Sequence, residues 1–587
     1  MVGEETLARA GGRRRRLTAR PGLWLKGGVV ALLTFAAYGP ALRGEFLWDD
    51  DHHLTRNPHM TSPGGLVRLW TSEAFYYPLA STTFWLGRRL WGLQAPAFHA
   101  LNVVLHLLNA LLIWRLMTRL GWRGGWLAAL IFALHPVHVQ SVAWITELKN
   151  VQSGCFYLLT LHAWVAFRAS GRTRWLWASV PLFALALASK TSTVMLPVVL
   201  VLMEALPSFR SAPLRWRWFL PFFLLSALAG GATLALHARE LGPPREVVDT
   251  WSERLIVAGR APWFYLSRLA WPAKLTFVYP RWEIDPASVT SWLPLASMAA
   301  LLAVLGLGRR RPLASGLMIA LTYFVLSLFP VLGFFQMYYA RYSRVADHWQ
   351  YLAAMGPTVG IAVLAAHARV RWFADALRGR AFASISAAVV GGLWLLTFRQ
   401  AAVYRNEETL WLDTIAKNPS ATIAYANLGA YYADRGETGR AVEIISRGIE
   451  TAPGDVDLRN NLGAALTQAG QPEAAIEHLR VALLSDPRNA EALNNLGLAL
   501  EAIGRLDEAI ETFRGAIEAH PSAIEPRNNL ARSLAAIGRA EEARQELHRA
   551  LRLAPDHPTL TDNLSRINRA MKNDEGPRLR DHEPPLD

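Results

Sequence analysis

The chain has 587 residues, of which 52% are hydrophobic and only 18% are charged, and it contains 23 Trp. This composition is too apolar for an ordinary soluble protein of this size and indicates a membrane protein. The formal net charge of +15 does not predict a nucleic-acid partner, because the arginines form short clusters between apolar runs, which is the pattern of membrane topology. The single cysteine, Cys155, excludes an internal disulfide and a Cys-based zinc site.

The first 400 residues contain eleven apolar runs that we interpret as membrane spans. An Arg13–Arg16 run precedes the first of them, and the absence of a convincing small-residue cleavage site there predicts a signal anchor. The segment 254–280 is also apolar, and we expect it to form an external interfacial or re-entrant helix. The eleven spans are predicted near 22–42, 98–118, 124–140, 151–168, 175–189, 192–206, 217–237, 292–308, 313–333, 350–368 and 382–398.

Arginine clusters on alternate loops predict the orientation of these spans, since basic residues near spans stay on the cytoplasmic side. A basic tail at 1–21 and the clusters would be cytoplasmic, and the other loops, together with everything after residue 400, would face the periplasm or the exterior. The sequence therefore predicts a multi-pass protein of the inner (plasma) membrane that contacts membrane lipids. The clusters lie at 115–123, 168–174, 210–217, 309–311 and 369–380.

A repeat of 34 residues occupies the second part of the chain. Pro419, Pro453, Pro487, Pro521 and Pro555 are each 34 residues apart, which is the tetratricopeptide (TPR) period. We place four repeats at 422–557, with Gly429, Gly463 and Gly497 and the small residues Ala441, Ala475, Ala509 and Ala543 at equivalent positions. The segment 401–421 would supply a connecting helix, and the polar tail 558–587 is expected to be disordered.

A leucine recurs every 34 residues, at positions 428, 462, 496 and 530. An asparagine directly precedes it in each repeat: Asn427, Asn461, Asn495 and Asn529. A TPR array forms a superhelix whose concave face binds extended peptides, so these amides could form a ladder along a peptide backbone. The alternative is that they bond within the repeat or to water.

Four polar groups lie on the predicted outer side, where ionisable residues near a bilayer are candidates for function. Each also has a structural alternative, such as an acidic helix flank, a snorkelling lysine or a local ion pair. Three Asp beside two His would permit a divalent metal ion, although no cofactor is certain. The groups are Asp49, Asp50 and Asp51 with His52 and His53; His135, His138, Glu147 and Lys149; Ser189 and Lys190; and Arg341, Arg344, Asp347, His348 and Tyr351.

The runs Phe46–Pro58, HPVHVQSVAWITELKNVQSG, LASKTSTVMLP and VADHWQYLA, followed by NLG-type repeats, resemble the bacterial relatives of the transmembrane and tetratricopeptide-repeat containing protein O-mannosyltransferases of the GT-C superfamily. The resemblance covers nearly the whole chain. It implies a GT-C-like bundle at 22–400 that transfers a sugar, with mannose expected, from a polyprenyl-phosphate donor to an acceptor hydroxyl outside the membrane.

The resemblance also implies roles for individual residues. Asp49 or Asp50 matches the family's paired acidic residues and would be the catalytic base, with Asp49 favoured. Lys190 matches the Ser–Lys element and would bind the donor phosphate, with His348 and Arg344 as further candidates. Further active-site candidates are Asp51, His52, His135, His138, Glu147 and Asp347; Gln140 and Leu148 depart from the family's pattern.

The leading hypothesis is a membrane glycosyltransferase whose repeats recruit a protein or peptide acceptor. One alternative is a non-catalytic membrane-anchored scaffold for envelope proteins. Another is a GT-C enzyme that acts on lipid or polysaccharide.

Overall fold

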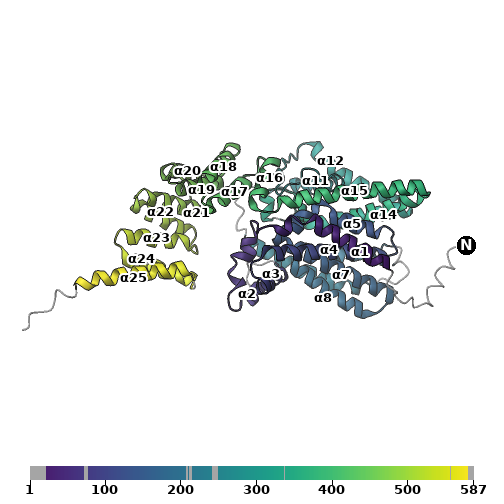
Figure 1. The fold of residues 1–587 in the computed structure, drawn as a ribbon, viewed down its shortest axis with the longest axis horizontal. Helices are drawn as coiled ribbons and strands as arrows, with labels where there is room; N and C mark the ends of the chain where they lie inside the picture. The colour runs from purple at the N-terminus through teal and green to yellow at the C-terminus, as the bar shows by residue number, and fades with distance from the viewer. Residues whose placement is uncertain are drawn as a thin grey trace, which may run out of the picture. The chain divides into compact units, whose positions relative to one another are not determined.

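The computed structural model describes residues 21–71, 77–206, 209, 215–240, 249–335, 337–555 and 557–578. Every regular element among these residues is helical, which confirms the predicted all-α class (Figure 1). The chain divides into two compact units, which we call the membrane unit (Met1–Leu410) and the repeat unit (Trp411–Asp587). The predicted basic tail lies outside the described residues except for Pro21.

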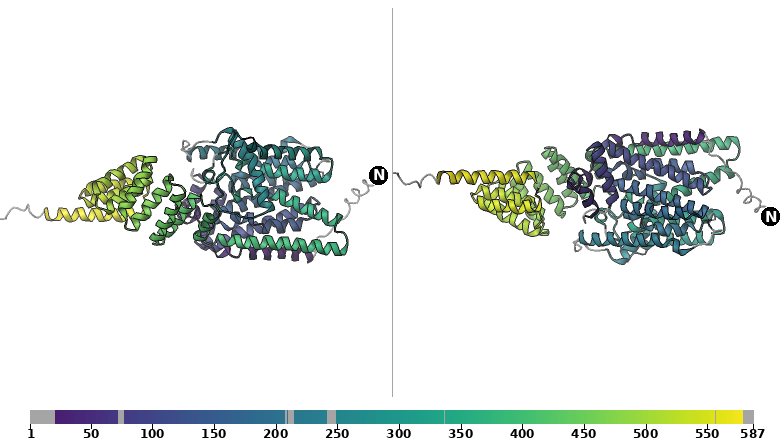
Figure 2. Two further views of the ribbon diagram at one scale, coloured as in Figure 1. Left: turned by 90° about the horizontal axis from the view of Figure 1, so that it is seen from above. Right: turned by 90° about the horizontal axis from the view of Figure 1, so that it is seen from below.

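The membrane unit consists of helices and short helical turns, and its long helices run side by side in the views of Figure 2. All eleven apolar runs of the sequence fall on helical structure. The α-helices are α1 (Pro21–Ala37), α2 (Gly65–Thr71), α3 (Pro78–Trp91), α4 (Ala95–Arg119), α5 (Gly125–Leu134), α6 (Val139–Ala143), α7 (Leu148–Ser170), α8 (Thr173–Ser189), α9 (Leu196–Met203), α10 (Leu220–Glu240), α11 (Trp251–Ala270), α12 (Val289–Leu307), α13 (Pro312–Leu328), α14 (Met355–Arg371) and α15 (Ala376–Val403).

Four helical segments in the described part of the chain are long and apolar enough to cross a membrane: Ala95–Arg119, Val289–Leu307, Pro312–Val331 and Ala376–Val403. A fifth span results if α5 and the helical segment Pro136–Ala143 are counted together, with a bend of 55° between them. Shorter apolar helices cover Gly22–Ala37, Thr191–Met203 and Leu220–Leu236. The number eleven and the placement of α11 therefore stay predictions.

A polar stripe on α4 faces the interior of the bundle. His99, Asn102, His106 and Asn109 are spaced by three or four residues and are all buried. Their side chains bond to backbone oxygens, for example Asn102 to Trp144 (3.2 Å) and Asn109 to Val151 (2.8 Å). The bent segment around α6 leaves backbone carbonyls without helical partners, and such groups must be satisfied inside a membrane protein. The stripe therefore stabilises a broken stretch of backbone.

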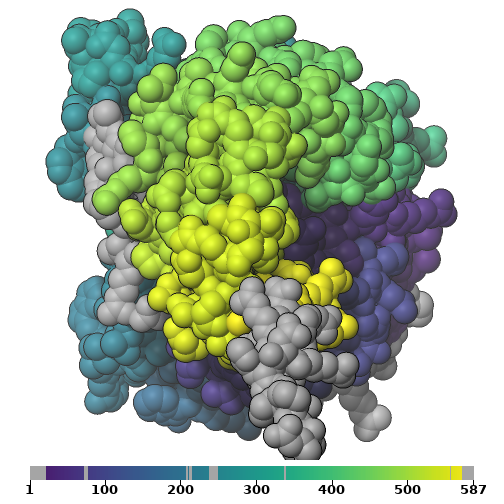
Figure 3. All heavy atoms as spheres, turned by 90° about the vertical axis from the view of Figure 1, so that its left-hand side faces the viewer, coloured from purple at the N-terminus to yellow at the C-terminus, as the bar shows by residue number. Residues whose placement is uncertain are grey.

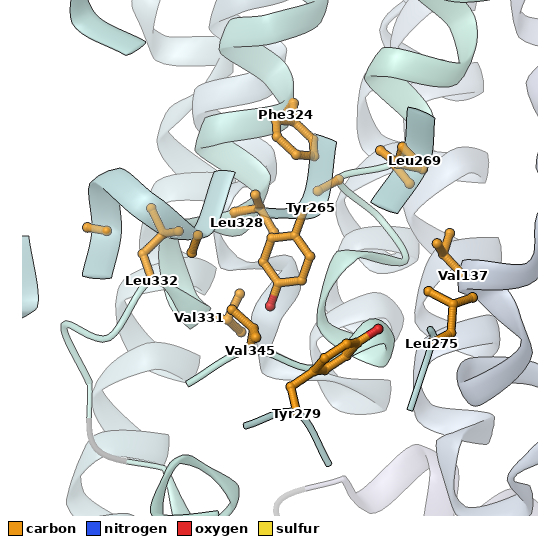
Figure 4. Close-up of a cluster of buried hydrophobic side chains, with 14 residues drawn as sticks. Val137, Tyr265, Leu269, Leu275, Tyr279, Phe324, Leu328, Val331, Leu332 and Val345 are labelled. Atoms are coloured by element: carbon orange, nitrogen blue, oxygen red, sulfur yellow. The ribbon is translucent and has the colours of Figure 1, made fainter. Parts of the chain in front are cut away.

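A buried cluster of aromatic and aliphatic side chains joins α11 and α13 to the segment that precedes α14 (Figure 4). Tyr265 of α11 accepts a hydrogen bond from the Ala346 amide at 3.2 Å, and Tyr279 reaches the neighbouring Asp347. Burying these large side chains contributes several kcal/mol, at roughly 25 cal/mol per Å² of apolar surface. The cluster thus fixes the short 3-10 turn η12 (Asp347–Gln350).

The repeat unit is a series of antiparallel helix pairs (Figure 1). Its atoms are coloured green to yellow in the space-filling view of Figure 3. The four helix pairs lie within the four predicted repeats, and α16 falls inside the predicted connecting segment. α16 (Glu407–Lys417) contains the boundary between the two units. The helices that follow are α17 (Thr422–Asp434), α18 (Thr438–Thr451), α19 (Val456–Gln468), α20 (Pro472–Ser485), α21 (Ala490–Ala502), α22 (Leu506–Ala519), α23 (Glu525–Ala536), α24 (Ala540–Leu553) and α25 (Pro558–Arg578).

Small residues allow the two helices of each repeat to approach closely. A Cβ atom at Gly463 or Gly497 would overlap the side chain of Leu479 or Phe513 on the second helix. On that second helix, Ala441, Ala475, Ala509 and Ala543 are completely buried. The repeat period therefore records a packing requirement.

The prediction that 558–587 is disordered was wrong for residues 558–578, which form α25. Leu560 is completely buried and Ile567, seven residues later, is 9% exposed, so the two lie on one apolar face. This face packs against α24 and covers the end of the array. The prediction weighed overall polarity and missed the apolar spacing; residues 579–587 lie outside the described part.

Candidate functional site

The three consecutive aspartates of the first loop have different environments. Asp50 is completely buried and accepts hydrogen bonds from the Leu47 amide (2.8 Å), the Thr146 amide (2.7 Å) and the Thr146 hydroxyl. Burial raises the pKa of Asp50 to about 7, against these three hydrogen bonds, which favour the carboxylate. Asp50 therefore ties the first loop to the segment before α7 and presents no free face to a substrate.

Asp49 is accessible, with about one third of its side chain exposed (34%), and lies 3.3 Å from the His53 Nε2 atom. Burial opposes its ionisation, but the hydrogen bond to His53 and the charges of His53 and Lys149 outweigh burial and lower the pKa of Asp49 to about 2. Asp49 is therefore a carboxylate at neutral pH, the form that can accept a proton.

The other two candidates of this loop lie beside Asp49 in the π-turn η3 (Asp51–Thr55). Asp51 accepts a hydrogen bond from Thr55 and forms an ion pair with Arg56 at 3.1 Å. His52 is exposed, and its ring meets the His53 ring edge-on. The loop thus has two accessible carboxylates: Asp49 is close to His53, and Asp51 forms an ion pair with Arg56 at the surface.

Glu147 lies between two lysines inside the membrane unit. Lys149 Nζ is 3.0 Å from one carboxylate oxygen, and Lys190 Nζ is 3.2 Å from the other. The Glu147 side chain is 1% exposed and each lysine side chain is 11% exposed. Asn150 also donates a hydrogen bond to Glu147. Two buried cations thus share a single carboxylate, which leaves one positive charge uncompensated within the trio.

The electrostatics of the trio follow from its burial and its composition. Burial opposes ionisation of Glu147, but the charges of Lys149 and Lys190 hold the pKa of Glu147 well below its usual range. Burial lowers the pKa of Lys190 to about 8, although the attraction of Glu147 acts in the opposite direction. Lys190 is therefore mostly protonated at pH 7 and loses its charge under mildly alkaline conditions.

The trio forms one cluster with residues from two other loops. Lys149 is close enough to Asp49 to lower its pKa, and His348 of η12 interacts electrostatically with Glu147, Lys190 and Lys149. We call Asp49, Glu147, Lys149, Lys190 and His348 the polar cluster. The structure therefore brings together side chains from all four of the polar groups that the sequence singled out. A carboxylate beside buried ammonium groups can take up a proton while the cations bind an anion.

η12 contributes His348 to the polar cluster and places Asp347 outside it. The His348 amide donates to Gln140 (3.1 Å), and its carbonyl accepts from Asn150 (2.8 Å). Burial lowers the pKa of His348 to about 3, so its imidazole is neutral at physiological pH. The Asp347 carboxylate accepts hydrogen bonds from the Tyr279 hydroxyl at 3.0 and 3.1 Å, which gives it a structural partner.

Arg344, predicted to bind the donor phosphate, is held by another residue. Both of its terminal nitrogens bind the Asp249 carboxylate, one of them at 2.9 Å. Burial is partial, with 12% of the Arg344 side chain and 29% of the Asp249 side chain exposed. A contact between Arg344 and a phosphate would therefore require this bidentate pair to open.

His135 and His138 lie in the core of the membrane unit and are not part of the polar cluster. His135 Nε2 is 2.9 Å from the Leu269 carbonyl oxygen, and His138 packs against Phe132 and Tyr351. Both rings are buried. Among the described residues, no group of three or more His, Cys, Asp or Glu side chains could hold a metal ion. The divalent metal ion that three Asp and two His would permit stays a prediction.

The asparagines of the repeat unit form a ladder between repeats. Asn495 donates to Asn460 at 2.8 Å and Asn529 donates to Asn494 at 2.9 Å, in each case across 35 residues of sequence. Asn563 of α25 continues the series by donating to Asn528 at 2.7 Å. The predicted peptide contacts of Asn495 and Asn529 would thus use amides that already join neighbouring repeats.

The first two predicted asparagines do not take part in this ladder. Asn427 donates to the Ile423 carbonyl of its own helix at 2.9 Å. Asn461 has Ala426 at the position where later repeats supply the acceptor asparagine, so the ladder begins one repeat later. The predicted peptide contacts of all four asparagines stay a prediction.

Two side chains around the polar cluster have contacts that the sequence pattern did not predict. Lys149 has no role in the sequence-based assignment; in the structure it pairs with Glu147, and its ammonium group lies 5.1 Å from the Tyr77 ring centroid, a cation–π distance. Its position two residues after Glu147 was the available signal. Tyr279, the partner of Asp347, lies in the apolar segment 254–280, and no local sequence signal marks it.

Comparisons with known proteins agree with this architecture. A family described as "Dolichyl-phosphate-mannose-protein mannosyltransferase" matches residues 77–233, which contain Glu147, Lys149 and Lys190. Two tetratricopeptide-repeat families match residues 460–524 and 500–562.

Curated relatives match both parts of the chain. The human "Protein O-mannosyl-transferase TMTC1" is 35% identical over 175 residues, which are 26% of this chain and 20% of the relative. The human "Protein O-mannosyl-transferase TMTC4" is 25% identical over 507 residues, which are 72% of this chain and 66% of the relative. The chain thus spans about a fifth of the length of the first relative and about two thirds of the second.

Solved structures also match a part of the chain. The structure titled "Functional Characterization of Pseudomonas Aeruginosa pilF" is 27% identical, with a TM-score of 0.25, and covers 26% of this chain and 69% of its own. The structure titled "Crystal structure of YrrB: a TPR protein with an unusual peptide-binding site" is 23% identical, with a TM-score of 0.23, and covers 34% of this chain and 96% of its own. By the family match and the curated relatives, the chain is similar to the TMTC protein O-mannosyl-transferases, and it combines a region that matches a mannosyltransferase family with TPR repeats.

Proposed function

We propose that the protein is a membrane mannosyltransferase that moves mannose from a polyprenyl-phosphate donor to a hydroxyl of a protein acceptor on the outer face of the membrane. The observation that carries the proposal is the polar cluster, in which the accessible carboxylate of Asp49 lies in the field of a buried Lys149–Glu147–Lys190 trio. The names of the relatives supply the sugar, and the resemblance supplies the lipid carrier.

The proposed reaction is a single displacement at the anomeric carbon of the sugar. The acceptor oxygen forms a bond to C1, and the bond between C1 and the phosphate oxygen breaks. The acceptor proton passes to Asp49, and the electron pair of the broken bond leaves on polyprenyl phosphate. A carboxylate whose pKa is about 2 in the free protein is fully ionised and able to receive the proton.

Donor binding would also adjust the basicity of Asp49. The positive charge of Lys149 contributes to the low pKa of Asp49. A donor phosphate bound at Lys149 and Lys190 would neutralise part of that charge, so the pKa of Asp49 would rise toward the range of an effective general base. The site would thus become a better base when the donor is present.

Lys190 and Lys149 are the proposed phosphate ligands, since they supply two charged donor groups a short distance from Glu147. As the carbon–oxygen bond breaks, negative charge accumulates on the departing phosphate, and preorganised cations stabilise that charge better than water does. His348 is neutral and can donate one hydrogen bond without adding charge.

The repeat unit would recruit the acceptor. A TPR superhelix offers an extended concave surface suited to a peptide chain, and this favours a polypeptide partner over a lipid or a polysaccharide. The interrepeat asparagine ladder would then keep the helices of that surface in register.

The test is sugar transfer by the full-length protein in lipid discs. The protein is supplied with radiolabelled polyprenyl-phosphate mannose and an extract of periplasmic or extracellular proteins, and polyprenyl-phosphate glucose serves as a matched donor. Label from mannose that enters protein, with little label from glucose, is the expected result.

Other outcomes would replace the proposal by one of its alternatives. Label that enters a lipid or polysaccharide fraction instead would indicate a GT-C enzyme with a different acceptor. No transfer from any polyprenyl-phosphate sugar by protein that still binds envelope proteins would indicate a membrane-anchored scaffold.

A further inference from the structure

A cavity of about 640 Å³ lies among α4, α7, α9, α13 and α14, within the size range of small-molecule sites in proteins. Its walls are mainly leucine, valine and methionine side chains of these helices, for example Leu116, Leu161 and Leu202. The cavity extends along α13 from Pro312 to Tyr323, about 17 Å at 1.5 Å per residue. It is therefore a long apolar slot between transmembrane-type helices.

One end of the slot is cationic. Arg123, Arg309 and Arg310 line it and are exposed, whereas the far end is bounded by Tyr323 and Met355. No Asp or Glu occurs among the described residues that line the slot. Three guanidinium groups at the rim of an apolar cavity complement a molecule with a long hydrocarbon chain and an anionic head.

The slot is separate from the polar cluster. The turn η7 (Thr191–Met195), which follows Lys190, packs against η10 (Phe329–Val331) at the far end of α13. Arg309 and Arg310 precede the first residue of α13, which is 17 residues long, or about 26 Å. The rim of the slot and Lys190 thus lie at opposite ends of this helix.

We propose that the slot binds an anionic phospholipid, with one acyl chain among the helices and the phosphate against Arg123, Arg309 and Arg310. A basic pocket between membrane helices is the kind of site that recognises lipid head groups. Arginines next to membrane spans also fix the orientation of those spans. That role does not require an apolar cavity beside Arg309 and Arg310. The lipid would fill the space among α4, α7, α9, α13 and α14.

The chain offers matched controls for both halves of this site. Arg311 follows Arg310 directly and is exposed, but it does not line the cavity. Gly316 lines the cavity and has open space where a Cβ atom would stand; Gly391 of α15 has equally open surroundings and does not line the cavity. Arg311→Gln therefore matches the rim variants, and Gly391→Leu matches a variant that fills the slot.

The experiment is native mass spectrometry of the full-length protein in detergent with added palmitoyl-oleoyl phosphatidylglycerol or phosphatidylcholine. Phosphatidylglycerol should bind at least about tenfold more tightly than phosphatidylcholine, since each basic residue near an anionic head group raises affinity about fivefold. The double variant Arg309→Gln/Arg310→Gln should remove most of that preference. Arg311→Gln should leave the preference unchanged. Gly316→Leu should reduce binding of both lipids, and Gly391→Leu should reduce neither.

Three results would overturn the proposal. Equal binding of the two lipids would remove the role of charge. An effect of Arg311→Gln as large as that of the double variant would show that the loop acts only through its total charge. Displacement of phosphatidylglycerol by an equal concentration of polyprenyl phosphate would assign the slot to the other class of lipid.

Discussion

At the scale of single residues, neighbouring aspartates acquire different roles from their hydrogen-bond partners. Asp50 receives three hydrogen bonds and is buried, whereas Asp49 is one third exposed and is paired with His53. A buried carboxylate with several donors organises a loop, while an accessible one can exchange a proton with a substrate. The family resemblance matches both residues, and the sequence does little to separate them, because they are the same amino acid in the same loop.

Lys190 predicts a pH dependence of donor capture. Its pKa of about 8 in the folded protein lies below the ordinary lysine value, so its charge is present below pH 8 and is lost as the pH rises. We expect kcat/KM for the donor to fall about tenfold per pH unit above pH 8, and kcat to fall less because a bound phosphate holds the proton.

Lys190→Arg provides the control for that profile, since a guanidinium group keeps its charge over the whole range. The alkaline decline of kcat/KM should move upward by more than one pH unit in this variant. A decline that stays near pH 8 would show that another group is responsible. The measurement is initial-rate kinetics at several donor concentrations between pH 6 and pH 10.

Lys190 and Arg344 differ in their predicted effect on donor affinity. Lys190→Gln should raise the donor KM about tenfold or more, because a charged hydrogen bond contributes about 1.5–3 kcal/mol. Arg344→Gln should raise it less than about threefold, because Arg344 is already paired with Asp249. A larger effect of Arg344→Gln in the same assay would place the phosphate at that arginine and contradict the polar cluster as its binding site.

At the scale of elements, polar side chains inside helices stabilise irregular backbone and the stacking of repeats. The stripe on α4 bonds carbonyls at the breaks around α5 and α6, with His106 close to the Ala133 oxygen and Asn102 donating to the Trp144 oxygen. The asparagine ladder joins successive repeats. The repeat helices themselves could be predicted because their period of 34 residues is a local pattern. The partners of the asparagines could not, since each hydrogen bond joins residues 35 positions apart.

The ladder predicts how two asparagines differ in stability. Asn529→Ala removes a hydrogen bond between α23 and α21 and should cost about 1 kcal/mol. Amide hydrogen exchange of α23 in the full-length protein should then be about fivefold faster. Asn427→Ala removes only a bond within its own helix and should have a smaller effect.

A result in which Asn427→Ala accelerates exchange as much as Asn529→Ala would contradict the role of the ladder. If Asn529→Ala instead weakened acceptor binding without changing hydrogen exchange, the predicted peptide contact would be the better explanation. The two measurements therefore separate the structural interpretation of these amides from the binding one.

At the scale of the whole molecule, hydropathy predicted where helices form. It could not predict which residues of the connecting loops come together in the folded protein. Each apolar run falls on helical structure, because the pattern is local. The polar cluster combines residues 49, 147, 149, 190 and 348, and this convergence depends on tertiary packing. His135 and His138 show the limit of the sequence argument, since a buried histidine in the core and one in a site have the same local pattern.

The predicted topology can be tested with the native chain as background, because Cys155 is its single cysteine and is buried. Asp285→Cys, Arg310→Cys and Glu450→Cys each introduce a cysteine at an exposed position. A membrane-impermeant maleimide applied to intact cells, or to cells whose outer membrane alone is opened, should label positions 285 and 450 and spare position 310. All three should react after full permeabilisation, and labelling of position 310 before that step would contradict the predicted orientation.

The role of Asp49 as the base is tested by mannose transfer in lipid discs with the wild type, Asp49→Asn and Asp51→Asn. In this assay kcat and the donor KM are determined separately. We expect Asp49→Asn to lower kcat at least about 100-fold and to leave the donor KM within a few-fold, because removal of a general base affects the transfer step. Asp51→Asn, which changes a surface carboxylate paired with Arg56, should stay close to wild type. Wild-type turnover by Asp49→Asn, or an equal loss in both variants, would contradict the assignment of Asp49 as the base.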